Sequence, residues 1–254
     1  MTEGDKMINF IDANCMVGKR MKSQEGVPQT ASELSEVMNR SGISRAIVYH
    51  CMASETDIIF GNRILDAEIK DFDCFMKQWV VMPDFLGEIS DADRLLEKMK
   101  ENNVKTVRIM PQKHGYSVKP YSIGKFINTL SECNIPIFID KAQVSFDEIY
   151  SLGTDYPDAS FVVCEPGYRS ARQYAPILDA CPNIYLETSN YCHHNGIRDI
   201  CRTYGANRLI FGSGMPNGSG TAATSIVRYS DISEEEKEMI ASGNILKLLE
   251  EVSL

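Results

Sequence analysis

The sequence predicts an α/β protein built as a single (β/α)8 barrel, the TIM-barrel architecture, with extra helices at the C-terminal end. Eight short apolar stretches alternate with segments whose apolar residues recur at helical spacing, which is the pattern of parallel strands joined by helices. The length of 254 residues is usual for such a barrel. No linker-like segment interrupts the chain, so we expect residues 1–254 to form one domain.

The first predicted strand lies between Met7 and Gly18, in the sequence MINFIDANCMVG. An apolar run that ends in a polar turn closed by glycine is typical of a buried parallel strand. In barrels of this kind, ligands bind at the C-terminal ends of the strands. Polar residues at strand ends are therefore the first candidates for a site. The other strands are predicted at residues 45–50, 76–83, 104–111, 136–140, 160–165, 184–187 and 208–211.

Helices are predicted between the strands. Thr30 is a suitable N-cap for a helix over residues 31–40, and Ser90 for a helix over residues 91–102. Right-handed crossovers place such helices outside the barrel. Two further helices, near residues 221–229 and 233–249, are expected to cover the outside as well. The remaining helices are predicted at residues 57–70, 122–133, 145–152, 171–180 and 196–204.

Composition excludes several classes of partner. The formal net charge of −9 repels nucleic acid and anionic membrane surfaces, so we expect neither as a partner. The eight cysteines form no C-x-x-C pair, which favours reduced thiols over a zinc knuckle or a disulfide framework. The opening MTEGDKM is charged and has no apolar signal segment. We therefore expect a cytoplasmic protein that binds a small molecule.

Polar side chains at or just beyond the predicted strand ends form the candidate site. They are Asn14, His50, Arg108, Asp140, Lys141, Glu165, Glu187 and His193. His50 has an ordinary alternative as a core or loop histidine. Arg108 could hold an anionic substrate or pair with a strand-end carboxylate. His193 and His194 are adjacent, and adjacent side chains point apart on an extended backbone, so at most one of them is expected to face a site.

Asp140 and Glu165 are the predicted catalytic residues. A carboxylate that closes an apolar strand is costly to bury unless it is paired, hydrogen-bonded or bound to a ligand. Because the two residues end neighbouring strands, we expect them to face the same cavity. Strand alternation then predicts that Cys164 points away from this cavity toward the helices, and Cys15 likewise.

Several motifs, in order along the chain, resemble those of the amidohydrolase superfamily. IDANCMVG is similar to the family's opening IDAHxHxG, PIFID to PVxxH, FVVCEPG to a strand ending in HxG, and RLIFGSGMP to R[IL][LI][FW]G[ST]DxP. The tail SGNILKLL is similar to the ending GNAxxLL. The branch that the chain resembles contains small decarboxylases, lactonases and metal-dependent hydrolases with a plain barrel. The resemblance implies hydrolase-type chemistry and a possible homodimer.

The chain departs from this family at the metal-ligand positions. The positions that the resemblance assigns to metal ligands are Asn14, Met16, Asp140, Glu165 and Gly214 here. Zinc favours imidazole and thiolate, and a methionine thioether offers it little. Gly214 also replaces the aspartate that would take a proton from an attacking water. We therefore expect no metal ligands of the usual kind and no cofactor.

Three hypotheses for function remain open from the sequence. In the first, the protein is a metal-independent enzyme in which Asp140 or Glu165 is the general base. Arg108 or Lys141 would hold a substrate carboxylate, and the reaction would be hydrolysis, lactone opening or another proton transfer on a small polar or aromatic acid. In the second, the protein is a non-catalytic ligand-binding pseudoenzyme. In the third, it is a hydrolase or decarboxylase with a weak, oxygen-ligated divalent metal such as Mg²⁺.

Overall fold

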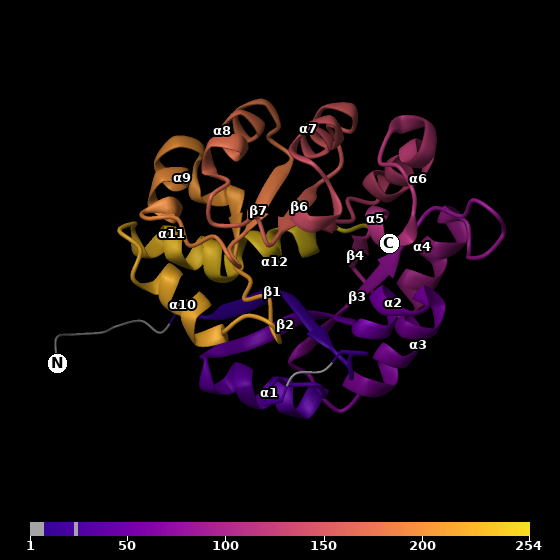
Figure 1. The fold of residues 1–254 in the computed structure, drawn as a ribbon, viewed down its shortest axis with the longest axis horizontal. Coiled ribbons are helices and arrows are strands. Elements are labelled where there is room, and N and C mark those ends of the chain that lie inside the picture. The colour runs from indigo at the N-terminus through magenta and orange to yellow at the C-terminus, as the bar shows by residue number, and fades with distance from the viewer. Residues whose placement is uncertain (1–7, 23–24) are drawn as a thin grey trace.

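The computed structural model describes residues 8–22 and 25–254 and confirms the (β/α)8 barrel. Eight parallel strands follow one another in the order β1 to β8, and the sheet curves into a nearly closed barrel with helices around it (Figure 1). Met7 and the charged opening lie outside the described residues. The strands are β1 (Phe10–Val17), β2 (Ile43–His50), β3 (Phe75–Val81), β4 (Thr106–Ile109), β5 (Ile137–Asp140), β6 (Phe161–Cys164), β7 (Ile184–Glu187) and β8 (Leu209–Ile210).

The segment that follows β8 closes the barrel against β1. The backbone N–H of Ala13 donates to the carbonyl of Phe211 at 3.0 Å, and the N–H of Met16 donates to the carbonyl of Met215 at 2.9 Å. These bonds continue the parallel pairing after the two residues of β8 have ended. The C-terminal end of β1 therefore lies beside the segment that follows β8, and the barrel is closed at this point.

Most helices match the predicted segments. The Thr30 side chain caps α1 together with Glu33, as predicted, whereas α4 is capped by Asp91 rather than by Ser90. The two short helices α2 and α5 follow β2 and β4 directly and were not predicted, because four or five residues are too few to show a helical repeat. The helices are α1 (Ala31–Arg40), α2 (Cys51–Glu55), α3 (Ile58–Ile69), α4 (Ala92–Glu101), α5 (Pro111–His114), α6 (Pro120–Glu132), α7 (Phe146–Asp155), α8 (Ala171–Ala180), α9 (Gly196–Tyr204), α10 (Gly220–Arg228), α11 (Glu234–Glu238) and α12 (Asn244–Glu250).

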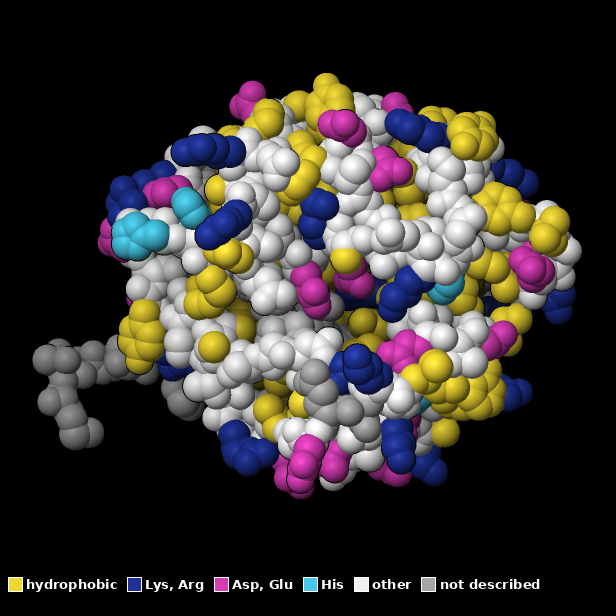
Figure 2. All heavy atoms as spheres, viewed as in Figure 1, with side chains coloured by type: hydrophobic (Ala, Val, Ile, Leu, Met, Phe, Trp, Pro, Cys, Tyr) yellow, Lys and Arg dark blue, Asp and Glu magenta, His cyan; other side chains and the backbone are white. Residues whose placement is uncertain are grey.

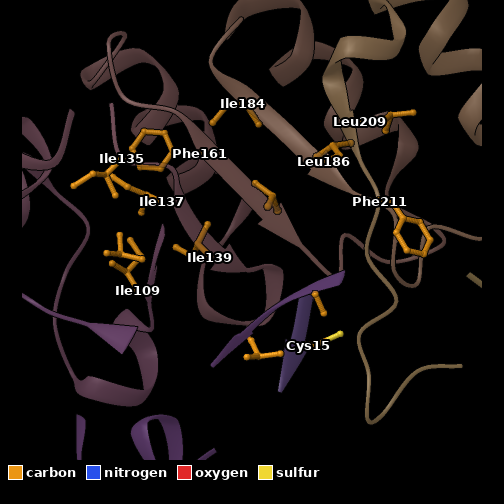
Figure 3. Packing of buried hydrophobic residues seen from close by; sticks show 14 of the residues in the cluster. Cys15, Ile109, Ile135, Ile137, Ile139, Phe161, Ile184, Leu186, Leu209 and Phe211 are labelled. Carbon is orange, nitrogen blue, oxygen red and sulfur yellow. The ribbon is translucent and has the colours of Figure 1, made fainter. Parts of the chain in front are cut away.

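Strand alternation divides the apolar core into two layers. Outward-facing residues such as Ile137, Ile139 and Leu186 pack against the helices in one large cluster (Figure 3). Inward-facing residues such as Phe138 and Val162 form a smaller cluster inside the barrel. The strands are therefore buried on both sides, which explains their continuous apolar runs.

The last helix closes the bottom of the barrel instead of covering its outside, which corrects the prediction for residues 233–249. Ile245, Leu248 and Leu249 of α12 belong to the same cluster as the barrel interior. The Lys105 ammonium, just before β4, donates to the carbonyl of Leu249 at 3.2 Å. A π-helical turn, Met239–Gly243, joins α11 to α12 and divides the single helix that was predicted. Figure 1 shows α12 behind the ring of strands.

No helix in the described ranges is both long and apolar enough to cross a membrane.

Replacing Ile245 by alanine tests this closure. Ile245 is fully buried beneath the barrel, so Ile245→Ala should lower the free energy of unfolding by about 2–4 kcal/mol through lost burial and the cavity left behind. Urea denaturation measures this change. Leu86→Ala, at a side chain that is 81% exposed, is the control and should change stability by less than about 0.5 kcal/mol. Equal effects of the two substitutions would show that α12 does not close the barrel.

Candidate functional site

Arg108 lies at the centre of the barrel mouth. Its position on β4 directs the side chain into the barrel, and the residue has no exposed surface. Its Nε donates to Gln78 Oε1 at 2.8 Å, Nη2 donates to Asn14 Oδ1 at 2.8 Å, and Nη1 forms a short ion pair with Asp140. Its guanidinium carbon lies 4.6 Å from the centre of the Tyr49 ring. Of the two alternatives from sequence, Arg108 adopts the pairing with a strand-end carboxylate.

A bulge in β1 turns Asn14 toward this arginine. Asp12 pairs with Ala46 and Cys15 pairs with Val48, so three residues of β1 span two of β2. An extra residue of this kind changes the direction of the side chains beside it. Cys15 consequently joins the outer cluster, as predicted (Figure 3), while Asn14 Nδ2 donates to Glu187 Oε2 at 2.9 Å. Asn14 therefore bridges Arg108 and Glu187.

Glu187 is a fully buried carboxyl group of the mouth. It has no exposed surface and accepts hydrogen bonds from Asn14 Nδ2, from the Ser189 hydroxyl and backbone N–H, and from the Glu165 backbone N–H at 3.2 Å. Burial raises the pKa of Glu187 to about 7, even though the bonds from Ser189 and Glu165 lower it. Glu187 therefore fixes Asn14 and the backbone of Glu165, and it changes charge near neutral pH.

Asp140 and Glu165 lie near each other at the ends of β5 and β6. Asp140 is the last residue of β5, and its side chain is 20% exposed. Glu165 follows β6 with a positive φ of 51° and is half-buried. Burial, and then the charge of Asp140, raise the pKa of Glu165. Figure 2 shows acidic side chains beside basic ones around the hollow at the middle of this face.

Cys164 faces the barrel interior, so the prediction that it points toward the helices is wrong. Its sulfur lies 3.6 Å from Arg108 Nη2, and it belongs to the interior cluster. The prediction placed Glu165 inside the barrel and therefore its neighbour Cys164 outside. However, β6 ends at Cys164 and Glu165 has a left-handed conformation, so inward and outward side chains do not alternate between these two residues. Burial raises the pKa of the Cys164 thiol well above its usual value, which makes it a poor nucleophile.

Two other predicted residues make contacts of their own, and a third lies in an exposed loop. His50 Nδ1 accepts from the backbone N–H of Met52 at 3.1 Å and so caps α2, and burial lowers the pKa of His50. The Lys141 ammonium donates to the carbonyl of Val144 at 2.9 Å and lies 4.3 Å from the centre of the Phe146 ring. His193 is exposed in the loop before α9. The structure therefore shows a local role for His50 and for Lys141 outside the Arg108 network.

Four residues of the network were not predicted. Gln78 and Tyr49 are polar groups inside apolar strands, a signal that would have found them by the argument used for Asp140. Asp12 Oδ1 accepts from the backbone N–H groups of Asn14 and Ser213, both at 3.0 Å, and so ties β1 to the loop after β8. Ser189 lies in the loop between β7 and α9, where no strand or helix periodicity predicts the direction of its side chain.

Two of the residues at the positions that the resemblance assigns to metal ligands are hydrogen-bonded to Arg108. Asn14 and Asp140 already accept hydrogen bonds from the Arg108 guanidinium. Gly214 has no side-chain ligand atom, and a Cβ placed there would lie 3.5 Å from the Ser189 hydroxyl and 3.7 Å from Glu165 Oε1. Within residues 8–22 and 25–254, no group of three or more His, Cys, Asp or Glu side chains is arranged to hold a metal ion.

The sequence profile of the amidohydrolase family matches residues 34–250. The chain belongs to the amidohydrolase family. No curated protein has a significantly similar sequence.

Solved structures share the fold at low sequence identity. An uncharacterized TIM-barrel protein from Bordetella bronchiseptica is 16% identical, with a TM-score of 0.75 over 96% of this chain and 99% of its own. A 2,6-dihydroxybenzoate decarboxylase from Rhizobium is 11% identical, with a TM-score of 0.77 over 96% and 99% of the two chains. A dihydroxybenzoic acid decarboxylase from Polaromonas with bound manganese is 14% identical, with a TM-score of 0.71 over 96% and 97%.

The raised pKa of Glu187 predicts a pH dependence of stability. A carboxyl group whose pKa is about 7 in the folded chain and ordinary in the unfolded chain binds more protons when folded, so stability should fall as pH rises from about 5 to 8. Glu187→Gln removes this titration. Urea denaturation at several pH values should show that the wild type loses roughly 2–3 kcal/mol more than Glu187→Gln over this interval.

The control for this measurement is Glu101→Gln, at an exposed position on α4. This variant should lose stability with pH as the wild type does. If the wild type and Glu187→Gln have the same pH dependence, Glu187 does not titrate near neutral pH.

Proposed function

We propose that this amidohydrolase-family barrel is a metal-independent, hydrolase-type enzyme in which Glu165 transfers a proton, Asp140 raises the pKa of Glu165, and Arg108 supplies a fixed positive charge. One observation carries the proposal: a fully buried guanidinium is bonded to Asn14 and Asp140, two of the positions that the family resemblance assigns to metal ligands. The loss of the metal site is thus part of the proposal.

Electrostatics support a guanidinium in place of a metal ion. An arginine side chain stays protonated in proteins, and its burial is tolerated only when its donors are satisfied. Gln78, Asn14 and Asp140 satisfy all three nitrogens of Arg108. A divalent cation at the same oxygen atoms would meet the positive charge of Arg108 at short range and in a medium of low dielectric constant.

Glu165 is the proposed general base. Its raised pKa brings it closer to neutral pH, where a base is most effective, and Asp140 contributes to this shift. In ester or lactone hydrolysis, the Glu165 carboxylate would take a proton from water as the water oxygen bonds to the carbonyl carbon. The protonated Glu165 would then return the proton to the departing alkoxide. The products are an acid and an alcohol, and no oxidant or reductant is needed.

The reacting group of the substrate is proposed to be uncharged. Two carboxyl groups repel an anion, Arg108 has no exposed surface, and the Lys141 ammonium is bonded to Val144. The carbonyl of an ester or lactone satisfies this condition. If the substrate is a small polar or aromatic acid, as the sequence suggested, its carboxylate lies away from the carboxyl pair.

The relatives support the choice of substrate size rather than of reaction. Several of the similar structures are decarboxylases of substituted benzoates, and three of these structures contain manganese. We propose small aromatic or polar compounds as substrates here as well. A cytoplasmic location and a homodimer stay predictions.

The proposal predicts an activity that survives chelation and depends on Glu165. We would screen aryl esters and aromatic or aliphatic lactones with protein treated with EDTA and passed through a desalting column. Glu165→Gln should lower kcat by at least about 100-fold, because a general base contributes roughly that much or more. The kcat of the wild type should rise with pH over a range higher than that of an ordinary glutamate.

Glu101→Gln is the matched control and should retain the activity of the wild type. Activity that is lost with EDTA and restored by Mg²⁺ or Mn²⁺ would favour the metal-dependent hypothesis. If compounds bind to the mouth and none is turned over, the protein is a ligand-binding pseudoenzyme. Unchanged kcat in Glu165→Gln would exclude this residue as the base.

A further inference from the structure

A pocket lies at the rim of the barrel, between the loops that follow β6 and β7. Its volume is about 510 Å³, and its lining includes Tyr168, Arg169, Arg172, His193 and His194. The Arg108 network does not contribute to this lining. In Figure 2, basic side chains and histidines gather over α8 and α9, where these loops meet.

The lining of this rim pocket is basic on a protein that is acidic as a whole. It contains two arginines and two histidines, and no carboxylate of the described chain is among its residues, whereas the net charge of the protein is −9. Asp199 is a nearby acidic side chain on α9, and it is paired with Arg198 at 3.0 Å. The lining of the pocket therefore contains no acidic side chain that would neutralise its two arginines.

The arrangement of groups in the rim pocket suits an anion with several oxygen atoms. The guanidinium carbon of Arg169 lies 5.1 Å from the centre of the Tyr168 ring, so one arginine is stacked on an aromatic face. Ala171, which also lines the pocket, is the first residue of α8, and the side chain of Ser170 bonds to the carbonyl of Gly167 instead of capping the helix. Guanidinium groups bind phosphate through two parallel hydrogen bonds.

From these observations we infer that the rim pocket binds the phosphate group of a small molecule, through Arg169 and Arg172 with His193 and His194 beside them. Two guanidinium groups match the charge of a phosphate dianion better than that of a carboxylate. Both histidines line this pocket, whereas the sequence predicted that at most one of them would face a site. It does not rest on the proposed catalytic chemistry, because its residues are separate from Asp140 and Glu165.

Imidazole NMR signals provide a direct test, since the chain has only four histidines. The full-length protein would be titrated with inorganic phosphate, and separately with acetate, at constant pH and constant ionic strength. The signals of His193 and His194 should shift and saturate with phosphate. Those of His50 and His114, which lie outside the rim pocket, should not move.

Variants then identify the groups that bind. All the arginines involved are exposed, so their replacement should not unfold the chain. Arg169→Gln with Arg172→Gln should weaken phosphate binding at least about tenfold, which corresponds to ~1.4 kcal/mol. The matched control, Arg40→Gln with Arg94→Gln, should bind as the wild type does. Non-saturating shifts, equal binding of acetate, or unchanged binding in the Arg169 and Arg172 double variant would overturn the inference.

Discussion

The burial of the Arg108 charge is the constraint on which the barrel mouth depends. A guanidinium cannot lose its charge in a protein, so the fold has to surround it with acceptors. Gln78 on β3, Asn14 on β1 and Asp140 on β5 provide these acceptors, and the Tyr49 ring from β2 lies over one side. A single side chain on β4 thereby fixes the direction of polar groups from four other strands.

The network extends from the arginine to the opposite wall of the barrel. Asn14 receives a hydrogen bond from Arg108 and donates one to Glu187 on β7, and Glu187 in turn holds the backbone of Glu165. Because Asn14 is an amide, it can accept from a cation and donate to a carboxylate at the same time. The substitutions at the family's ligand positions are thus consistent with one another.

The sequence was sufficient for the barrel but not for the direction of every side chain. Apolar strands and helical repeats gave the bounds of α1, α8, β7 and α9, since each is long or regular enough to show its period. The sequence of α12 shows an apolar face, but it does not show that this face packs against the interior of the barrel. Cys164 was oriented wrongly because a left-handed residue follows it, and strand alternation contains no information on such a break.

The candidate site was predicted in part for a similar reason. The positions of Asp140 and Glu165 follow from strand ends in a closed barrel, whereas the hydrogen bonds of His50 and Lys141 depend on short local turns. Gln78 was within reach of the sequence, because a polar residue in an apolar strand needs a buried partner.

The central claim is that the guanidinium of Arg108 occupies the place of a metal ion. The most direct measurement is a crystal structure of the protein soaked in MnCl₂, with anomalous scattering collected to locate manganese. We expect no anomalous peak between Asn14, Asp140 and Glu165, and we expect the guanidinium of Arg108 to remain bonded to Asn14 and Asp140. A manganese ion at those three residues, with Arg108 displaced, would contradict it.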